Sequence, residues 1–399
     1  MYLFYHDDFV LGGNTVYLPK LLEGLPPTEY MLIYSGSTSV KQYLRNSGIS
    51  ESARSEFNIY GYDCIRDIVE NLSWVPTIVR RILVKCLFFL KPFFVYYTFK
   101  RVGHILNSLN LERYQKLVVN SGGYFGSAVS RCFLRHAGLP CIYIIHNHIP
   151  ESSLSNKKLL QTVSNYVNHW VVGSKVIQNQ LMERCSVKKQ NISLVHYGFK
   201  PAFLPDLESK KKARCKLNIP DDSFVVLHPS VFEKRKGHYY TIRAFSELLS
   251  QKPNSRLILA GGDGRDREYV IKLVGKYKIN DYVTYPGFYS PFEELLSVAD
   301  VLCLPSQSYD TTPIVIILAL ACKVPVLTTD RKDFEDILFD GENAFLVPID
   351  NYQLITEKLT KLADDKFDKS YLVESGFEIY QKFFTEKKMV LDTIKVIKQ

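Results

Sequence analysis

Short apolar runs alternate with longer mixed segments along the chain, and each run ends in small or polar residues. In the first half the runs read MYLFYH, EYMLIYSG, KLVVNSGG, CIYIIHNH, HWVVGS and ISLVHYG. Parallel strands connected by crossover helices give this alternation. The pattern therefore predicts a doubly wound α/β domain in the first half of the chain.

The second half repeats the alternation. Its apolar runs are FVVLHPS, SRLILAGG, YVTYPG, DVLCLPS and KVPVLTT, separated by helix-like stretches such as HYYTIRAFSELLSQ. We therefore expect two Rossmann-like doubly wound domains over residues 1–199 and 200–375, followed by a helical tail over residues 376–399. The charged segment 200–216 is expected to be a linker or the first turns of a solvated helix. Two such domains place the carboxyl ends of their strands around a central cleft, the expected ligand site.

Composition and charge narrow the class of protein. A chain of 399 residues that is 46% apolar can bury two cores, which excludes a disordered or fibrous protein. The formal net charge of +9 favours an anionic partner.

The cysteines and the first residues bear on the cellular compartment. The eight cysteines are scattered and form no C-x-x-C pair, which argues against disulfide or zinc frameworks and indicates a reducing cytoplasm. The opening segment MYLFYHDDFVLGG is acidic where a secretory signal would be basic, so no signal peptide is expected.

Residues 75–101 have the most unusual composition. They include six basic residues, no acidic residue and many aromatic residues, but their longest uncharged run, Pro92 to Phe99, is too short to span a membrane. One interpretation is a peripheral segment that lies among the headgroups of an anionic membrane surface. The alternative is a set of helices that pack on the domain core and keep their lysines in solvent.

Two segments of the first half carry candidate site residues. Gly12 and Gly13 follow the opening strand, where glycine lets backbone N–H groups approach a phosphate at a helix N-terminus. A glycine pair at a strand end also occurs for steric reasons alone. His146 closes the run CIYIIH, and its imidazole would point into the cleft and bond a substrate hydroxyl or phosphate. The competing interpretation is a hydrogen-bonded core histidine.

Two further segments lie in the second half. The turn EKRKG places Arg235 and Lys236 directly before a helix. A diphosphate leaving group gains negative charge as its bond to a sugar breaks, so cations at a helix N-terminus stabilise that state. A solvated surface turn is the alternative interpretation. The loop AGGDG places Gly262 at a strand-to-helix turn, which is expected to support the cleft through close backbone approach.

In this order and spacing, these segments resemble the retaining glycosyltransferases of family 4, which have the two-domain GT-B fold. The resemblance covers most of the chain and is strongest from Leu227 to Val347, where LILAGGDG and YPGFYSPFEELLSVADVLCLPS match the family pattern with little change. It implies a nucleotide-sugar donor held mainly by the C-terminal domain and an acceptor held by the N-terminal domain. It also implies transfer with retention at the anomeric carbon.

The resemblance assigns roles to single residues. Lys236 falls on the lysine that contacts the donor diphosphate, and His146 falls on the histidine near the reacting sugar. In the E-x7-E motif, Asp310 corresponds to the glutamate that touches the transferred sugar and Leu318 to the glutamate that holds the ribose. The implied catalytic residues are therefore His146, Lys236 and Asp310. The implied donor-binding residues are Gly13, Arg235, Gly262, Thr312, Pro313, Ile314 and Leu318.

Two departures from the family pattern bear on activity. Leu318 cannot accept hydrogen bonds from ribose hydroxyls, and Ser230 or Val231 stands where the family usually has an arginine. Arg235 could supply that charge from the same turn. The sequence contains no D-x-D motif, so we expect no metal and no cofactor beyond the donor substrate.

We therefore expect a metal-independent, hexosyltransferase-type enzyme of bacterial surface polysaccharide synthesis. It would use a glycan or lipid-linked glycan acceptor, and it would be cytoplasmic and peripheral at the inner face of the membrane. The alternative is a catalytically inactive GT-B partner or binding subunit of another glycosyltransferase. A dinucleotide-dependent oxidoreductase is disfavoured because the G-x-G-x-x-G fingerprint is missing. Nucleic-acid binding is disfavoured because the basic residues form no recognisable reading element.

Overall fold

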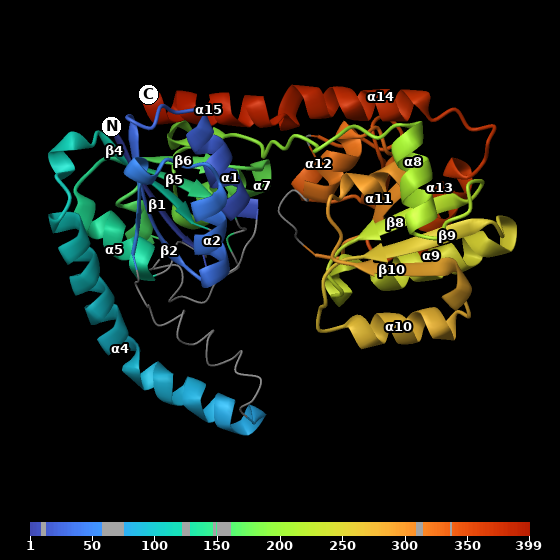
Figure 1. The fold of residues 1–399 in the computed structure, drawn as a ribbon, viewed down its shortest axis with the longest axis horizontal. Helices are drawn as coiled ribbons and strands as arrows, with labels where there is room; N and C mark the ends of the chain where they lie inside the picture. Colours follow the sequence, from blue (N-terminus) through green and yellow to red (C-terminus); the bar gives the residue numbers. More distant parts are fainter. Residues whose placement is uncertain are drawn as a thin grey trace. The chain divides into compact units, whose positions relative to one another are not determined.

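Figure 1 shows the fold of the computed structural model, which describes residues 1–8, 13–57, 76–121, 128–146, 149, 161–308, 314–335 and 337–399. The chain forms two compact units. The first unit contains Met1–His196 together with Met389–Gln399, and the second contains Tyr197–Lys388. Each unit is built on a parallel sheet with helices packed against it.

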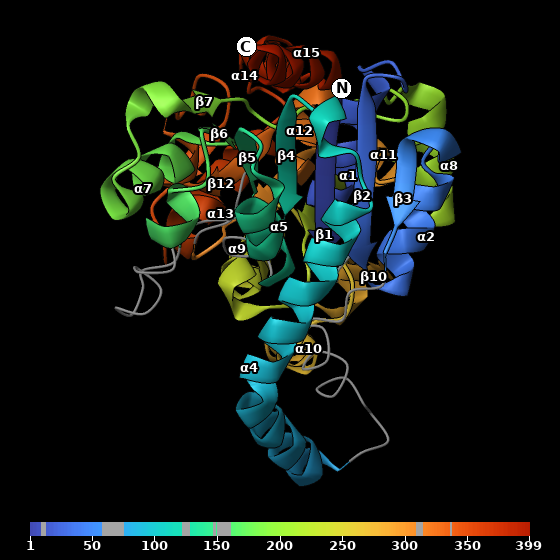
Figure 2. The same cartoon turned by 90° about the vertical axis from the view of Figure 1, so that its left-hand side faces the viewer.

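The sheet of the first unit has seven strands in the order β3-β2-β1-β4-β5-β6-β7, which Figure 2 shows across the unit. The order reverses between β1 and β4, and open α/β sheets bind ligands at such a switch point. The strands are β1 (Tyr2–Asp8), β2 (Tyr30–Gly36), β3 (Arg54–Glu56), β4 (Lys116–Ser121), β5 (Cys141–Ile145), β6 (His169–Val172) and β7 (Ile192–Leu194). The helices between them include α1 (Gly13–Glu23), α2 (Thr38–Asn46), α4 (Thr77–Asn107), α5 (Ala128–Ala137) and α7 (Lys175–Cys185).

The sheet of the second unit has the strand order β10-β9-β8-β11-β12-β13, so its switch point lies between β8 and β11. Its strands are β8 (Phe224–Pro229), β9 (Ser255–Ala260), β10 (Val283–Gly287), β11 (Val301–Leu304), β12 (Val326–Thr329) and β13 (Phe345–Val347). Its helices include α8 (Leu207–Lys216), α9 (His238–Gln251), α10 (Arg267–Lys276), α11 (Glu293–Val298), α12 (Ile314–Ala321), α13 (Tyr352–Leu362) and α14 (Ser370–Ile379). A π-helical turn over Tyr380–Phe384 leads from α14 into α15 (Glu386–Lys398).

The two doubly wound parallel-sheet domains predicted from the apolar runs are confirmed. Each predicted run contains a strand, and the structure adds the edge strands β3 and β13, which have three residues each. The segment 207–216 is the helix α8 rather than a linker. Asp206 caps this helix, because its carboxylate accepts the backbone N–H of Ser209 and its own backbone N–H donates to the Ser209 hydroxyl, both at 2.8 Å.

The C-terminal helix α15 completes the first unit. The Tyr17 hydroxyl on α1 lies 2.7 Å from the Thr393 hydroxyl on α15, and both residues are buried. The same helix lies against Gly24, where an added Cβ would come within 2.4 Å of Val390 and 2.6 Å of Ile394. The expected start of a tail at residue 376 lies inside α14, and the chain passes from the second unit to the first at residue 389.

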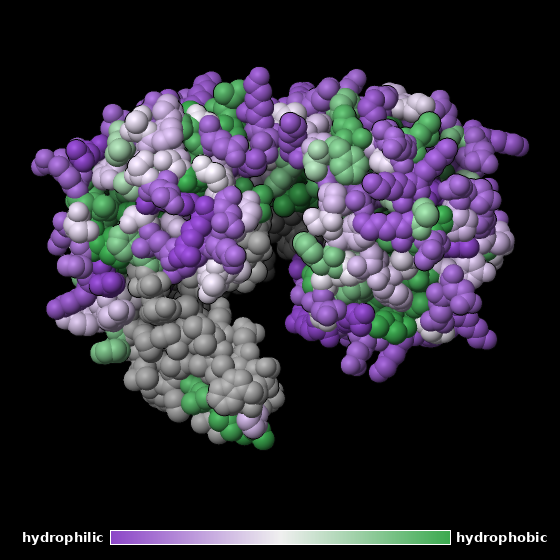
Figure 3. Space-filling model, in the orientation of Figure 1, coloured by the Kyte–Doolittle hydropathy of each residue, from purple (hydrophilic) through white to green (hydrophobic). Residues whose placement is uncertain are grey.

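The helix α4 has two different parts. Its last turns pack in the core of the first unit through Val102, Ile105 and Leu106, whereas its earlier turns extend away from the sheet (Figures 1 and 2). Figure 3 shows hydrophobic side chains at the outer end of α4. The exposed apolar residues on the extended part are Ile78, Val79, Leu83, Phe93, Tyr96 and Tyr97. None of the helices that the structure describes has the length and apolar character needed to cross a bilayer.

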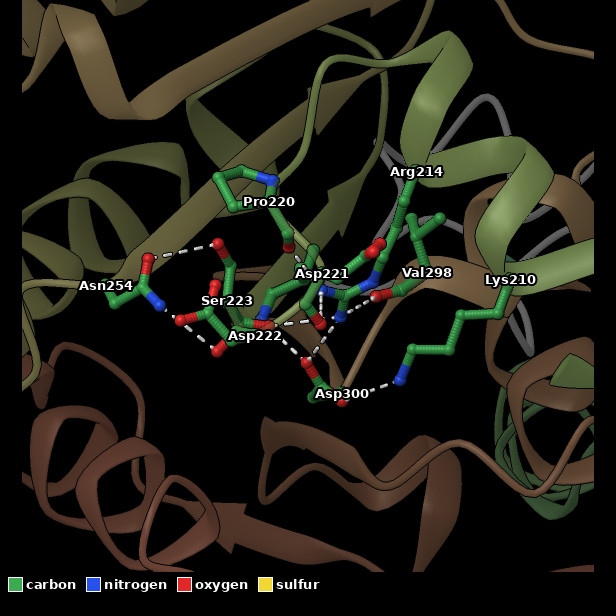
Figure 4. A network of polar contacts seen from close by, with 10 residues as sticks. Lys210, Arg214, Pro220, Asp221, Asp222, Ser223, Asn254, Val298 and Asp300 are labelled. Atoms are coloured by element: carbon green, nitrogen blue, oxygen red, sulfur yellow. Dashed lines mark hydrogen bonds and ion pairs between the residues drawn. The ribbon is translucent and has the colours of Figure 1, made fainter.

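A buried arginine fastens the amino ends of the strands in the second unit (Figure 4). Arg214 on α8 donates from Nη1 to the carbonyls of Pro220 and Asp221, at 2.6 and 2.8 Å. Its Nη2 donates to the Ser223 carbonyl at 3.0 Å and to the Asp300 carboxylate at 3.4 Å. Asp300 also accepts the backbone N–H of Val225 on β8 at 2.8 Å. This network lies at the amino ends of the strands, whereas a ligand site is expected at their carboxyl ends. It therefore stabilises the fold and takes no part in that site.

Candidate functional site

The basic turn of the second unit, residues 233–237, follows β8 and leads into α9. Lys234, Arg235 and Lys236 form a single 3-10 turn. Gly237 ends the turn with φ of 78°, a left-handed conformation that glycine adopts without strain, and it is the N-cap of α9. The first N–H groups of a helix carry a partial positive charge. Lys236 therefore adds its ammonium to a helix end that already favours an anion.

Two neighbouring loops hold the basic turn in place. Gln307 donates its backbone N–H to the Arg235 carbonyl at 2.7 Å, and Asp266 accepts the Lys234 backbone N–H at 2.8 Å. The Arg235 guanidinium donates from Nε to the Glu233 carboxylate at 2.6 Å. Part of the Arg235 charge is therefore compensated inside the turn, which makes Arg235 a weak replacement for the arginine that the family pattern contains.

A buried histidine pair lies beside the basic turn. His228, at the carboxyl end of β8, contacts the Thr241 hydroxyl through Nδ1 at 2.8 Å and the Ser230 hydroxyl through Nε2 at 2.9 Å. The ring centroids of His228 and His238 are 4.2 Å apart. Burial holds the pKa of His228 well below its usual range, and the charges of His238 and Lys236 add to this effect. The pKa of His238 is lowered to about 4, mainly by burial. Both rings are therefore neutral at pH 7, so the positive charge of this region comes from the lysine and arginine side chains of the basic turn.

The glycine-rich loop after β9 packs against the strand end that precedes the basic turn. An added Cβ at Gly261 would lie 2.0 Å from the Ser230 carbonyl oxygen, and one at Gly264 would lie 2.3 Å from the Phe232 carbonyl oxygen. Both glycines are therefore required by packing. Gly262, the predicted donor-binding residue, has no atom within 4 Å of such a Cβ. Its Cα faces open space, so packing does not require a glycine at this position.

The loop after β11 is tied to the end of β12. The Thr329 hydroxyl donates to the Ser306 carbonyl at 2.7 Å, and the buried Arg331 guanidinium donates to the Ser308 carbonyl. The Ser306 hydroxyl is itself buried and has no hydrogen-bond partner among the described residues. Residues 305–308 therefore present a fixed backbone beside the basic turn. The predicted site residues Asp310, Thr312 and Pro313 lie outside the described residues.

The helix α12 begins at Ile314, one of the residues predicted to bind the donor. Leu318, at the predicted ribose position, is half-buried and packs against the core of the second unit. All eight residues of α12 are aliphatic. The side chains of this helix therefore offer no acceptor for a ribose hydroxyl.

The site residues predicted in the first unit follow β1 and β5, the two strands that flank β4. Gly13 is the first residue of α1 after β1, and His146 directly follows β5. His146 is buried, and its Nε2 lies 2.6 Å from Oδ1 of Asn120 on β4. Its ring centroid is 5.2 Å from that of Tyr17, in an edge-to-face arrangement. Burial and the neighbouring His6 lower the pKa of His146 to about 3, so its imidazole is neutral under physiological conditions.

The structure thus gathers the predicted residues in two groups. In the second unit, Arg235, Lys236, Gly262 and the start of α12 lie on loops that follow adjacent strands. In the first unit, Gly13 and His146 follow strands on either side of β4. The first group suits an anion, and the second offers a neutral hydrogen-bonding imidazole. Within the described part of the chain, no His, Cys, Asp and Glu side chains gather as a metal ion would require.

Comparison with known proteins places these groups in a family context. Residues 209–378, inside the second unit, match the family described as glycosyl transferases group 1. The chain is 26% identical to the putative glycosyltransferase EpsD of Bacillus subtilis over 153 residues, which are 38% of this chain and 40% of EpsD. It is 26% identical to the alpha-monoglucosyldiacylglycerol synthase of Acholeplasma laidlawii over 276 residues, 64% of this chain and 67% of that protein. The chain thus spans less than half of EpsD and about two thirds of the synthase.

Solved structures share the fold over the whole chain. HepE from Anabaena, in complex with UDP, has a TM-score of 0.80 at 16% identity and covers 100% of both chains. Sucrose-phosphate synthase from Thermosynechococcus elongatus has a TM-score of 0.72 at 17% identity and covers 100% of this chain and 99% of its own. At these identities the likeness shows the fold alone. The two Rossmann-like units therefore have the GT-B architecture.

Proposed function

We propose that this GT-B protein is a retaining glycosyltransferase that moves a sugar from a nucleotide-sugar donor to a glycan or lipid-linked glycan acceptor. The observation that carries the proposal is the position of Lys236 at the amino end of α9, inside the segment that matches glycosyl transferases group 1. The relatives support the same class of reaction, since they include an O-antigen biosynthesis glycosyltransferase of Escherichia coli, 26% identical over 45% of this chain and 53% of that protein.

The donor we propose is a sugar linked to a nucleoside diphosphate, and UDP is the first nucleotide to test, because HepE has been seen in complex with UDP and with UDP-glucose. In the proposed step the bond between the anomeric carbon and the diphosphate oxygen breaks. The acceptor hydroxyl oxygen bonds to the same carbon on the same face, and its proton passes to a diphosphate oxygen. Lys236 and the start of α9 stabilise the departing diphosphate, so the step requires no metal.

The acceptor we propose lies at an anionic membrane surface, on the cytoplasmic side, as an intermediate of a bacterial surface polysaccharide. The extended part of α4 supports this, since Phe93, Tyr96 and Tyr97 are exposed at i, i+3 and i+4 spacing. The Lys100 ammonium lies 5.3 Å from the centre of the Tyr96 ring. Aromatic rings beside cations suit the headgroup layer, where rings enter the acyl boundary and ammonium groups meet phosphates.

The test compares two lysines of the same turn. Lys236→Met is expected to lower kcat by roughly 100-fold or more with a UDP-sugar donor, because it removes a charge that meets the leaving group. Lys234→Met is the matched control, since the Lys234 ammonium lies 5.0 Å from the centre of the Tyr269 ring on α10. Thermal melting in UDP gives a second readout, because a ligand of the folded state raises the melting temperature. Equal activity of the two variants would refute the assignment of Lys236.

A second candidate is a catalytically inactive GT-B subunit that binds another glycosyltransferase. The aliphatic helix α12 favours it, since Leu318 packs against the core where a ribose-binding carboxylate is expected from the family pattern. This candidate predicts that no nucleotide or nucleotide sugar shifts the melting temperature at millimolar concentration, while a partner enzyme co-purifies. A nucleotide-dependent shift that is lost in Lys236→Met would exclude it.

A further inference from the structure

The segment 305–308, which follows β11, lies between the end of β12 and the basic turn of the second unit. Toward β12, the Thr329 hydroxyl donates to the Ser306 carbonyl at 2.7 Å. Toward the basic turn, the Gln307 backbone N–H donates to the Arg235 carbonyl at 2.7 Å. The backbone at Ser306 and Gln307 is therefore fixed from both sides.

The side-chain amide of Gln307 has a defined orientation. Its Nε2 atom lies 2.7 Å from the Pro305 carbonyl oxygen, which can only accept a hydrogen bond. If the two amide atoms were exchanged, an oxygen would face that oxygen without a hydrogen between them. The donor Nε2 must therefore face Pro305, and the acceptor Oε1 lies on the other arm of the amide.

This amide lies beside the start of α9. The Pro305 carbonyl oxygen that accepts from Nε2 also packs on Gly237, where an added Cβ would lie 1.9 Å from it. Gly237 is the N-cap of α9, and Lys236 directly precedes it. Gln307 is therefore connected to the basic turn twice, by its backbone N–H and through Pro305.

Two adjacent polar atoms of this segment lack a hydrogen-bond partner. Oε1 of Gln307 and the hydroxyl of Ser306 are both buried, and neither has a partner in the part of the chain that the structure describes. Ser306 is 3% exposed. A buried polar atom without a partner destabilises the folded state, so each one needs an explanation such as a water, an ion or a functional role. An acceptor such as Oε1 requires a group that donates.

We propose that Oε1 of Gln307 accepts a hydrogen bond from a hydroxyl group of the ligand whose phosphates lie at the basic turn. The inference deepens the proposed function and rests on it for the identity of that ligand. A sugar linked to a nucleoside diphosphate carries hydroxyl groups on both sides of the diphosphate, on the ribose and on the transferred sugar. The aliphatic side chains of α12 cannot accept from them, whereas the Gln307 amide can.

The first experiment compares ligands with and without hydroxyl groups. Inorganic pyrophosphate supplies the phosphates alone, UDP adds the ribose, and UDP-glucose adds the sugar. Gln307→Met keeps the length of the side chain but removes the acceptor. We expect roughly tenfold weaker binding of UDP-glucose and unchanged binding of pyrophosphate, measured by isothermal titration calorimetry at constant ionic strength.

The same titrations identify the source of the hydroxyl. A tenfold loss that is already present with UDP assigns the contact to the ribose. A loss that appears only with UDP-glucose assigns it to the transferred sugar. Equal losses for pyrophosphate and UDP-glucose would mean that Gln307 acts only by supporting the basic turn, and this would overturn the proposal. Unchanged affinity for all three ligands would mean that a water alone meets Oε1, and it would overturn the proposal as well.

A control and a measurement without any variant complete the test. Gln251→Met is the matched control, since Gln251 is exposed at the last position of α9, and it should leave all three affinities unchanged. A crystal structure of the unaltered protein with UDP-glucose should place Oε1 about 2.7 Å from a ligand hydroxyl oxygen. An Oε1 atom that contacts only protein or water in that complex would contradict the proposal.

The outcomes separate this inference from the proposed function. Binding of UDP-glucose that depends on Gln307, in a protein that transfers no sugar, would support the hydroxyl contact and count against the enzyme. Sugar transfer with an unchanged KM for the donor in Gln307→Met would do the reverse.

Discussion

The Cα of Gly237 faces the carbonyl oxygen of Pro305 so closely that an added Cβ would lie 1.9 Å from that oxygen. Gly237→Ala must therefore displace either the basic turn or the loop after β11. The variant would also hold alanine at φ of 78°. We expect a loss of roughly 2 kcal/mol or more in the free energy of unfolding, together with weaker UDP binding. Urea denaturation and isothermal titration calorimetry measure the two effects.

Gly341 provides a control that separates the backbone strain of a positive φ from steric overlap of the added Cβ. Gly341 has φ of 77°, but no atom lies within 4 Å of an added Cβ. Gly341→Ala should therefore cost about 1 kcal/mol and leave UDP binding unchanged. Equal losses of stability and binding in both variants would contradict the packing argument for Gly237.

Adjacent glycines of the loop after β9 should respond differently to alanine. An added Cβ at Gly261 would lie 2.0 Å from the Ser230 carbonyl oxygen, so Gly261→Ala should destabilise the second unit by about 2 kcal/mol. Gly262 faces open space, so Gly262→Ala should change stability by less than about 0.5 kcal/mol. If a donor lies over this loop, the same variant should raise the KM for the donor. An unchanged KM would remove Gly262 from the binding residues.

Loss of the Arg214 side chain should destabilise the second unit without touching the site. Arg214→Met takes one of its hydrogen-bond donors from the Asp300 carboxylate and leaves the carbonyls of Pro220, Asp221 and Ser223 without the guanidinium, at a cost of about 3 kcal/mol. Lys210→Met is the control, because Lys210 reaches the same carboxylate at 3.5 Å from a more exposed position. It should cost less than about 1 kcal/mol. Urea denaturation of both variants would contradict this if the two losses were equal.

Three buried histidines should make the protein sensitive to mild acid. The folded state lowers the pKa of His146 to about 3 and of His238 to about 4, and it lowers that of His228 as well. Unfolded histidines titrate near 6.5, so the unfolded state binds more protons below that pH. Stability is therefore full above about pH 6.5 and falls as the pH decreases, by up to about 1.4 kcal/mol per pH unit for each histidine.

Denaturation midpoints between pH 7 and 5 measure this effect. The carboxyl groups whose pKa is lowered, such as Glu56 and Asp222, contribute only at lower pH, so this window reports histidines. His238→Asn should reduce the slope of stability against pH. Stability that stayed constant from pH 7 to 5 would show that the buried rings accept protons in the folded state.

The exposed aromatic residues of α4 should bind anionic vesicles. Replacing Phe93, Tyr96 and Tyr97 together by serine removes apolar area that would enter the acyl boundary, so we expect at least a tenfold weaker partition into phosphatidylglycerol vesicles. Tyr371→Ser is the control, since Tyr371 is 68% exposed on α14 of the other unit. Sedimentation with vesicles that gave equal binding for all variants would defeat the membrane assignment.

The sequence pattern predicted the strands that form the sheets because a parallel strand buried on both faces must be apolar. It missed β3 and β13, since three-residue edge strands leave no periodicity to detect. It also missed that α15 joins the first unit. The amphipathic pattern of α15 indicates a buried face, but the partner, Gly24 with the hydroxyl of Tyr17, is more than 360 residues away in the chain.

The site could be predicted in part. Arg235 and Lys236 stand before a glycine and a helix, which is a local signal. His228 and Asn120 gave no such signal, because a single polar residue at the end of an apolar run is typical of an ordinary turn. Their hydrogen bonds depend on partners from other elements, Thr241 on α9 for His228, and His6 on β1 and His146 after β5 for Asn120.

The return of the chain to the first unit at α15 also determines which unit is completed first during synthesis. Residues 389–399 emerge from the ribosome only after the whole second unit, yet they provide the Thr393 partner of the buried Tyr17 hydroxyl. Until then the nascent first unit must keep the face around Gly24 uncovered while nearly 200 further residues are translated. The first unit, although most of it is made earlier, is therefore completed last.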